Sequence, residues 1–287
     1  MGANTERFRL LANGVVFHEL SHEQLCAALI GLTRVVLRPG LNTIVNEDHF
    51  ALWSWCGELL LSPVSQIFAV TQFEIRSLYE TVIRSALAHC RKPPATKEER
   101  HTQNRIEESQ PHHAKQLVRE SSLVLAYLGF PLLEAILKRA SANYVAFDGQ
   151  VISTFSVSNK QGNPRRYAPN GASRSGQCSS LRDLLFLHRS AVAVPRLKAR
   201  IDRFRLHLTS LDGTQDPFDL LYGWRNQSLH GSTNSQTIGG SVLNLSLLIS
   251  LFEIEHNFEQ HRLQTLDHCR WVEQSQHRRP DSFYPPY

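Results

Sequence analysis

Residues 237–266 read TIGGSVLNLSLLISLFEIEHNFEQHRLQTL and carry two apolar stripes instead of one. The first stripe comprises Ile238, Val242, Leu245, Ile249 and Phe252, and the second comprises Leu243, Leu247, Leu251, Ile254 and Phe258. Steps of three and four residues are the spacing of one helical face. A helix that is apolar on two sides is buried on two sides. The stretch therefore predicts one long helix inside a helical bundle, with one side packed against its own chain and the other able to face a second subunit.

The same helical spacing recurs through most of the chain and predicts an all-α fold. Serines, prolines and Asp216 stand where helices should begin, because they satisfy or do not need the first backbone N–H groups. The expected helices span 21–37 with Ser21 as cap, 47–61, 63–90 opened by Pro63, 117–140 with a break at 129–131, a segment capped by Ser179 or Ser180, one opened by Pro195, and one opened by Asp216 and Pro217.

Three stretches depart from this pattern. Residues 91–115 are polar and charged, which is typical of a mobile linker or a solvated helix. Residues 151–157 could form a short strand, and residues 159–180 form a long, basic, glycine-rich segment expected to be a flexible loop. We therefore predict an N-terminal helical segment at 1–62, a helical domain at 63–270 with flexible insertions near 91–115 and 155–180, and a tail at 271–287.

Composition limits the classes of function. The chain has 287 residues, of which 41% are hydrophobic and 20% charged, as in ordinary soluble globular proteins. No stretch approaches the roughly 20 apolar residues of a membrane span, and the polar N-terminus lacks a signal-peptide pattern. A cytoplasmic protein without membrane partners is expected.

Metal and cofactor sites are not predicted. The five cysteines, an odd number, are widely spaced and include no Cys-x-x-Cys, which argues against a disulfide framework or a closed zinc site. The pair His112 and His113 lacks a third ligand at a fixed spacing. Gly171 and Gly176 are not followed by the Lys and Ser or Thr of a phosphate-binding loop. We expect no metal and no cofactor.

Positive charge is concentrated in one segment. Residues 160–210 hold eleven Lys or Arg and two acids, a net charge of +9, whereas the rest of the chain sums to −4. Such a local excess favours a polyanionic partner, most simply nucleic acid, although a solvated surface is the plainer alternative. The candidate RNA-binding residues lie on the helix opened by Pro195 and are Arg196, Lys198, Arg200 and Arg203.

A second informative stretch follows this basic segment. Residues 220–231 read LLYGWRNQSLHG, an apolar approach followed by Arg225, Asn226, His230 and a glycine suited to ending a helix. On a helix, Asn226 and His230 share a face, and Arg225 lies about 100° away. The alternative is a plain helix end with an exposed arginine and a capping histidine.

This stretch resembles the motif of the HEPN superfamily, an Arg followed by a polar residue and, four to six residues on, a His. The resemblance implies a HEPN-like helical bundle with additional N-terminal helices and a long basic loop, often dimeric through the motif region. Catalytic members are metal-independent endoribonucleases, some of them toxins or defence proteins with an antitoxin or other regulatory partner. The Tyr that follows the His in some HEPN toxins is replaced here by Gly231 and Ser232.

The residue types suit RNA cleavage by the 2′-hydroxyl group of the RNA itself. That reaction needs a base, an acid and positive charge on the phosphate. We assign proton transfer to His230, phosphate binding to Arg225, and orientation of His230 or the substrate to Asn226. A two-fold homodimer would bring two copies of each residue together. The alternative is a noncatalytic module that binds RNA or protein. A solvent cleft lined by residues 160–210 and facing Arg225 and His230 would favour the nuclease, whereas burial and pairing of both residues within the chain would favour the module.

Overall fold

The computed structural model describes residues 17–37, 47–62, 65–89, 96–170, 175–228, 235–274 and 283–284. Within these residues the chain is all-α, as predicted, with one small hairpin. The elements are η1 Phe17–Glu19, α2 His22–Val36, α3 Glu47–Leu60, α4 Phe73–His89, α5 Lys97–Ser109, α6 His112–Arg119, α7 Ser121–Ala140, β1 Phe155–Ser158, β2 Pro164–Tyr167, α8 Leu181–Leu187, η2 His188–Val192, α9 Pro195–Thr209, α10 Pro217–Ser228, α11 Ser235–Glu253, η3 Glu255–Asn257 and α12 Phe258–Gln274.

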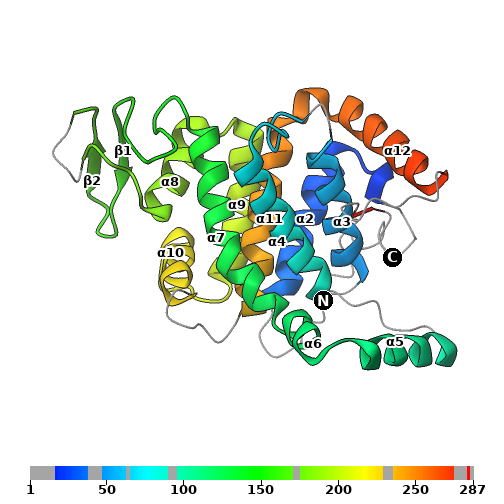
Figure 1. Ribbon diagram of the computed structural model, residues 1–287. Helices are drawn as coiled ribbons and strands as arrows, with labels where there is room; N and C mark the ends of the chain where they lie inside the picture. The colour runs from blue at the N-terminus through cyan, green and yellow to red at the C-terminus, as the bar shows by residue number, and fades with distance from the viewer. Residues whose placement is uncertain are drawn as a thin grey trace.

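Helix α11 is the central helix of the bundle. It packs against α7 and α2, and α4 lies on another side of α7 (Figure 1). Both apolar stripes are buried within the chain itself, with only Phe252 partly exposed. The suggestion that one stripe faces a second subunit is therefore wrong, because the chain's own helices already cover it.

The predicted single helix at 237–266 is also wrong. Helix α11 ends at Glu253, and the chain bends by 64° before α12. Two interactions end α11: the His22 imidazole hydrogen-bonds the Leu251 carbonyl oxygen at 3.0 Å, and the Ile254 N–H donates to the same oxygen at 3.2 Å. The bond from Ile254 spans three residues instead of four, which is how the last turn of a helix often tightens and closes.

Helix α7 is continuous through 129–131, where a break was predicted. Pro131 removes one backbone donor, but Phe130, Leu132 and Leu133 are buried in the core and hold the helix together. By length and composition alone α7 could cross a membrane, as could α11 and α12 as one bent pair, so the expectation that no segment approaches these limits does not hold. Most of α7 is buried among other helices, and core helices meet the same criterion.

Helix α4 begins at Phe73, ten residues later than predicted from Pro63. The described residues before it, from Ser65 to Gln72, form turns. Arginine side chains take the carbonyl oxygens that a helix would use, since Arg139 donates to Ile67 at 3.1 Å and Arg76 to Phe68 at 2.9 Å. Long-range hydrogen bonds of this kind leave no periodic signal in the sequence.

Of the two alternatives predicted for the polar stretch 91–115, the solvated helix is the one found in its described residues. Helix α5 has no buried residue and extends away from the bundle in Figure 1. The predicted strand 151–157 is displaced: β1 pairs antiparallel with β2, and Phe155 lies opposite Tyr167. Part of the expected flexible loop is therefore an ordered strand, because β1 and the core give it partners.

Several predicted helix starts are confirmed. Ser21 forms a capping box with Gln24 at the start of α2, and Ser180 accepts from the Asp183 N–H at 3.4 Å. Pro195 occupies the first turn of α9. The Asp216 carboxylate accepts from the Phe218 N–H at 2.8 Å and so caps α10, the helix that carries the motif.

Candidate functional site

Helix α10 is anchored by its first half and leaves its last turns half-exposed. Phe218 and Leu221 are fully buried, whereas Tyr222 and Trp224 pack against the core with part of each ring accessible. Arg225 therefore projects from the last turns of a helix whose position the core fixes. An arginine near a helix C-terminus is also favoured by the helix dipole.

Arg225 has defined partners. Its Nε donates to Glu134 Oε1 on α7 at 3.2 Å, and its Nη1 donates to Asn226 Oδ1 at 3.4 Å. The Arg225 side chain is 33% exposed and that of Glu134 20% exposed. The carboxylate fixes the orientation of the guanidinium while the fork remains accessible to solvent.

Asn226 is oriented toward Arg225 by this contact, where the sequence suggested a role beside His230 or the substrate. The last turn of α10 is held by a side-chain bond: Ser228 Oγ donates to the Arg225 carbonyl oxygen at 2.9 Å. His230 and the glycine expected to end the helix, Gly231, lie outside the described residues. The structure thus brings Arg225 and Asn226 together, and the position of His230 stays a prediction.

Several cations of the basic segment pair with acids from elsewhere in the chain, which lowers its local excess of charge without removing it. On α9, Arg196 binds Glu23 at 3.0 Å and also Glu255, and Arg200 binds Glu23. Lys198 and Arg203 are exposed, and no ion pair among the described residues includes either of them. Of the four candidate RNA-binding residues, two are therefore engaged in holding α9 against α2 and η3.

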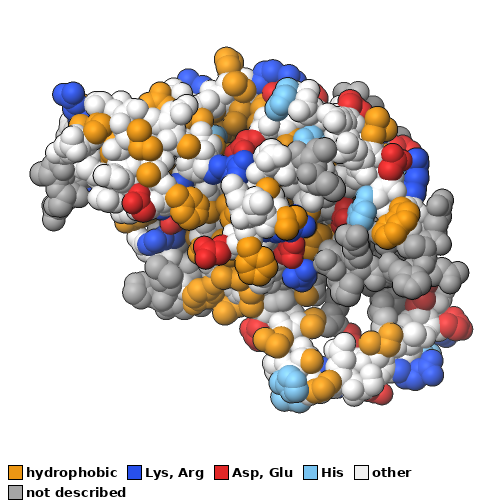
Figure 2. All heavy atoms as spheres, turned by 45° about the horizontal axis from the view of Figure 1, so that its top comes forward, with side chains coloured by type: hydrophobic (Ala, Val, Ile, Leu, Met, Phe, Trp, Pro, Cys, Tyr) orange, Lys and Arg blue, Asp and Glu red, His pale blue; other side chains and the backbone are white. Residues whose placement is uncertain are grey.

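Two more arginines of the basic segment form ion pairs along α9. Arg189 binds Asp202 with a bidentate pair of hydrogen bonds, which holds the pKa of that carboxyl below its ordinary value. Arg205 binds Asp216 at 2.6 Å and thereby ties α9 to the start of α10. On the face shown in Figure 2, the coloured Lys and Arg side chains are scattered among Asp and Glu instead of forming one continuous basic area.

A buried ionic network that was not predicted from the sequence joins α10 to α8 and β2. Arg182 on α8 binds Asp219 on α10 at 2.6 Å, and its guanidinium also contacts Asp183 at 3.2 Å. Tyr167 on β2 donates to Asp183 at 2.6 Å, and burial, together with this hydrogen bond, raises the pKa of Tyr167. The hairpin, α8 and α10 thus share one network, and the only local signal for it is the adjacent Arg182 and Asp183.

The hairpin also reaches the motif helix directly. Lys160 lies 4.0 Å from Asp219 and 6.0 Å from the centre of the Tyr222 ring. Its side chain is 66% exposed, so its ammonium group stays in contact with water. A cation from the basic segment therefore stands above α10, although no hydrogen bond or ion pair among the described residues joins the four α9 candidates to Arg225.

Metal ligation and similarity to known proteins give no further assignment. Within the described ranges, no group of three or more His, Cys, Asp or Glu side chains is arranged to hold a metal ion. Comparisons with protein families, with curated proteins and with solved structures found no match. The likeness to HEPN proteins therefore rests on the sequence of residues 220–231.

Proposed function

We propose that the end of α10 is the site of a metal-independent endoribonuclease, completed by the same site of a second copy in a homodimer. One observation carries the proposal: a third of the Arg225 side chain stays exposed, although Glu134 Oε1 accepts from its Nε at 3.2 Å. An arginine oriented in this way can take a phosphate without first being ordered. His230 follows five positions later in the sequence.

The reaction follows from these groups. A histidine takes the proton of the RNA 2′-hydroxyl, whose oxygen attacks the neighbouring phosphorus atom. The bond from phosphorus to the 5′-oxygen breaks, and the second histidine of the dimer donates a proton to that oxygen. The products are a 2′,3′-cyclic phosphate and a 5′-hydroxyl end. Arg225 stabilises the charge that builds on the phosphate oxygens.

Glu134 is a positioning residue in this proposal. Its carboxylate holds Nε of Arg225, and Asn226 Oδ1 accepts from Nη1, so the phosphate would bind Nη2 and the second N–H of Nη1. Glu134→Gln keeps a hydrogen-bond acceptor but removes the charge. We expect this variant to retain more activity than Glu134→Ala, in which the arginine is released.

A noncatalytic module that binds RNA or a partner protein is the second candidate. The ion pair between Arg225 and Glu134 favours it, because a half-buried intrachain pair can serve folding alone. The pairing of Arg196 and Arg200 with Glu23 points the same way. In either case a toxin-like or defence role, with an antitoxin or other regulatory partner, follows only from the resemblance in the motif.

A substrate substitution separates the two candidates. We expect the protein to cut a labelled RNA in EDTA, and to leave intact the same RNA carrying one 2′-deoxynucleotide at the mapped cut. Arg225→Ala should reduce cleavage by about 100-fold. Arg270→Ala is the matched control, since Arg270 is an exposed, ion-paired arginine on α12. Binding of both RNAs without cleavage of either would favour the noncatalytic module.

The dimer requires its own test. If both active-site copies are needed, the rate per subunit should fall when the protein is diluted through its dimer dissociation constant. Sedimentation at the same concentrations measures the fraction of dimer. A purely monomeric protein with an undiminished rate per subunit would contradict the composite site.

A further inference from the structure

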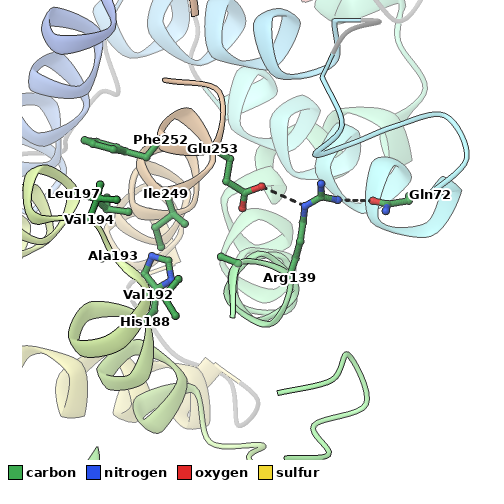
Figure 3. A pocket seen from close by; sticks show the side chains of 11 residues that line it. Gln72, Arg139, His188, Val192, Ala193, Val194, Leu197, Ile249, Phe252 and Glu253 are labelled. Atoms are coloured by element: carbon green, nitrogen blue, oxygen red, sulfur yellow. Dashed lines mark hydrogen bonds and ion pairs between the residues drawn. The ribbon is translucent and has the colours of Figure 1, made fainter. Parts of the chain in front are cut away.

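A pocket of about 570 Å³ lies between α7, η2, α9 and α11, and none of its lining residues belongs to α10. Val194, Leu197, Ile249 and Phe252 form an apolar wall (Figure 3). The volume lies within the range of small-molecule sites, which combine apolar walls with a few placed polar groups. Its polar side chains are those of Gln72, Arg139, His188 and Glu253.

His188 is the most unusual of these residues. Its side chain is almost fully buried, at 2% exposure, and burial lowers its pKa to about 4. At neutral pH the ring is therefore uncharged and offers one donor and one acceptor. Neither ring nitrogen has a hydrogen-bond partner among the described residues, whereas buried polar groups in proteins are nearly always paired.

The backbone at His188 is also unusual. His188 begins a short π-helix that runs to Val192, and the Ala193 N–H donates to the His188 carbonyl oxygen at 2.7 Å. Short π-helical turns are rare and occur frequently at functional sites. This turn holds the imidazole at the pocket, where Figure 3 draws it beside Ala193 and Ile249.

Glu253 is the second lining residue with an unpaired buried polar atom. Its Oε2 accepts from Arg139 Nε at 3.3 Å, while Oε1 is buried without a hydrogen-bond partner among the described residues. Arg139 also donates through Nη1 to Gln72 Oε1 at 2.8 Å and to the Ile67 carbonyl oxygen at 3.1 Å. Nε and Nη1 of the arginine are thus occupied, and the free oxygen of Glu253 still needs a donor.

We propose that this pocket binds an uncharged small molecule with an apolar body, an amide N–H that donates to Glu253 Oε1, and a second polar group that bonds to the His188 ring. In Figure 3 the imidazole lies beside Ile249, and the carboxylate lies between Ile249 and Arg139. The His188 ring nitrogens and Glu253 Oε1 are closed to solvent, so binding requires both side chains to turn toward the pocket.

The charges of the pocket exclude other classes of ligand. Arg139 and Glu253 already form a neutral pair. An anionic ligand would face the Glu253 carboxylate beside an arginine whose charge that carboxylate already balances. A cationic ligand would leave an uncompensated charge against an apolar wall. An amide brings the missing donor with no net charge.

Three matched probes test the proposal: indole-3-acetamide, indole-3-acetate and tryptamine, which share one ring system and differ in the charge of the side chain. Titration followed by ligand-observed NMR should give the amide a Kd of about 1 mM or tighter. We expect the acid and the amine to bind at least about 10-fold more weakly. No saturation by the amide at about 5 mM, or equal affinity for all three probes, overturns the proposal.

Two variants locate the binding. His188→Phe removes the imidazole nitrogens and keeps an aromatic ring, and Ala193→Trp fills the pocket from a partly exposed position. Both should weaken binding of indole-3-acetamide at least about 10-fold. His101→Phe, at an exposed position on α5, is the control and should leave it unchanged. Unchanged binding by Ala193→Trp would show that the amide binds elsewhere.

Discussion

Individual side chains in this protein are explained by long-range partners more than by their neighbours in sequence. Arg225, Arg182 and Arg139 each pair with an acid at least 37 positions away. The sequence identified Arg225 as special through its spacing to His230 and counted Arg182 only as part of a basic run. A charge count cannot tell an arginine that faces an RNA from one that joins two helices.

The buried pair of Arg182 and Asp219 should be important for stability. Asp219→Ala leaves the Arg182 guanidinium buried without its closest acid, so we expect the free energy of unfolding to fall by about 3 kcal/mol. Urea unfolding followed by circular dichroism measures the change. Asp267→Ala, which breaks an exposed pair with Arg270, should cost less than about 1 kcal/mol. Equal effects of the two variants would contradict the assigned role.

Buried histidines make the stability depend on pH. Burial lowers the pKa of His188 from 6.5 to about 4, so between these values the unfolded chain binds a proton that the folded protein does not. Stability due to His188 is complete above pH 6.5 and falls as the pH drops toward 4, by on the order of 3 kcal/mol. As the pH falls from 6.5 to about 4, the unfolding free energy of the wild type should therefore fall relative to that of His188→Phe. Parallel curves would contradict it.

At the scale of elements, local signals marked several helix starts but not that of α4, which begins ten residues after Pro63, and they failed where helices bend. Ser21, Ser180, Pro195 and Asp216 mark true helix starts, because capping involves residues only two or three positions apart. The bend after Glu253 was not predictable, since it depends on His22 from another helix. The spacing of apolar residues predicts which face of a helix is buried, but it does not predict where contacts with other elements end the helix.

Two glycines in helices should respond in opposite ways to the same substitution. A Cβ on Gly239 of α11 would lie 2.7 Å from Leu125 Cγ and 3.0 Å from the Ala126 backbone nitrogen, so Gly239→Ala should destabilise by about 1–3 kcal/mol. A Cβ on Gly223 of α10 meets no atom within 4 Å, so Gly223→Ala should stabilise by up to about 1 kcal/mol. Chemical denaturation of both variants checks the difference. A stabilising Gly239→Ala would refute the close packing of α11 on α7.

For the whole molecule, the all-α class and the central helix were predictable, because a doubly apolar stretch admits few other arrangements. The helical core also includes the buried side chains of α2 and α3 beside those of α7 and α11. The candidate site was predictable only in part: the sequence identified Arg225 and Asn226 but not Glu134, which approaches from 91 positions away. The internal pairing of the basic segment could not be inferred from its net charge.

The exposed cations should therefore dominate RNA binding. Lys198→Ala and Arg203→Ala should each weaken binding for all sequences and reduce the slope of log affinity against log salt by about 1. Arg196→Ala should have a smaller effect on the slope, because Glu23 and Glu255 already neutralise that arginine. Fluorescence anisotropy at several salt concentrations provides the slopes. A larger change for Arg196 than for Arg203 would contradict this ranking.

The most direct test of the proposed function is cleavage of a labelled single-stranded RNA in EDTA by the wild type and by His230→Ala, with the cut ends identified. The account predicts cleavage by the wild type, cyclic phosphate ends, and a loss of at least about 100-fold in the variant. Equal activity of the two proteins would contradict the account, because the cleavage would then arise from another site or another protein.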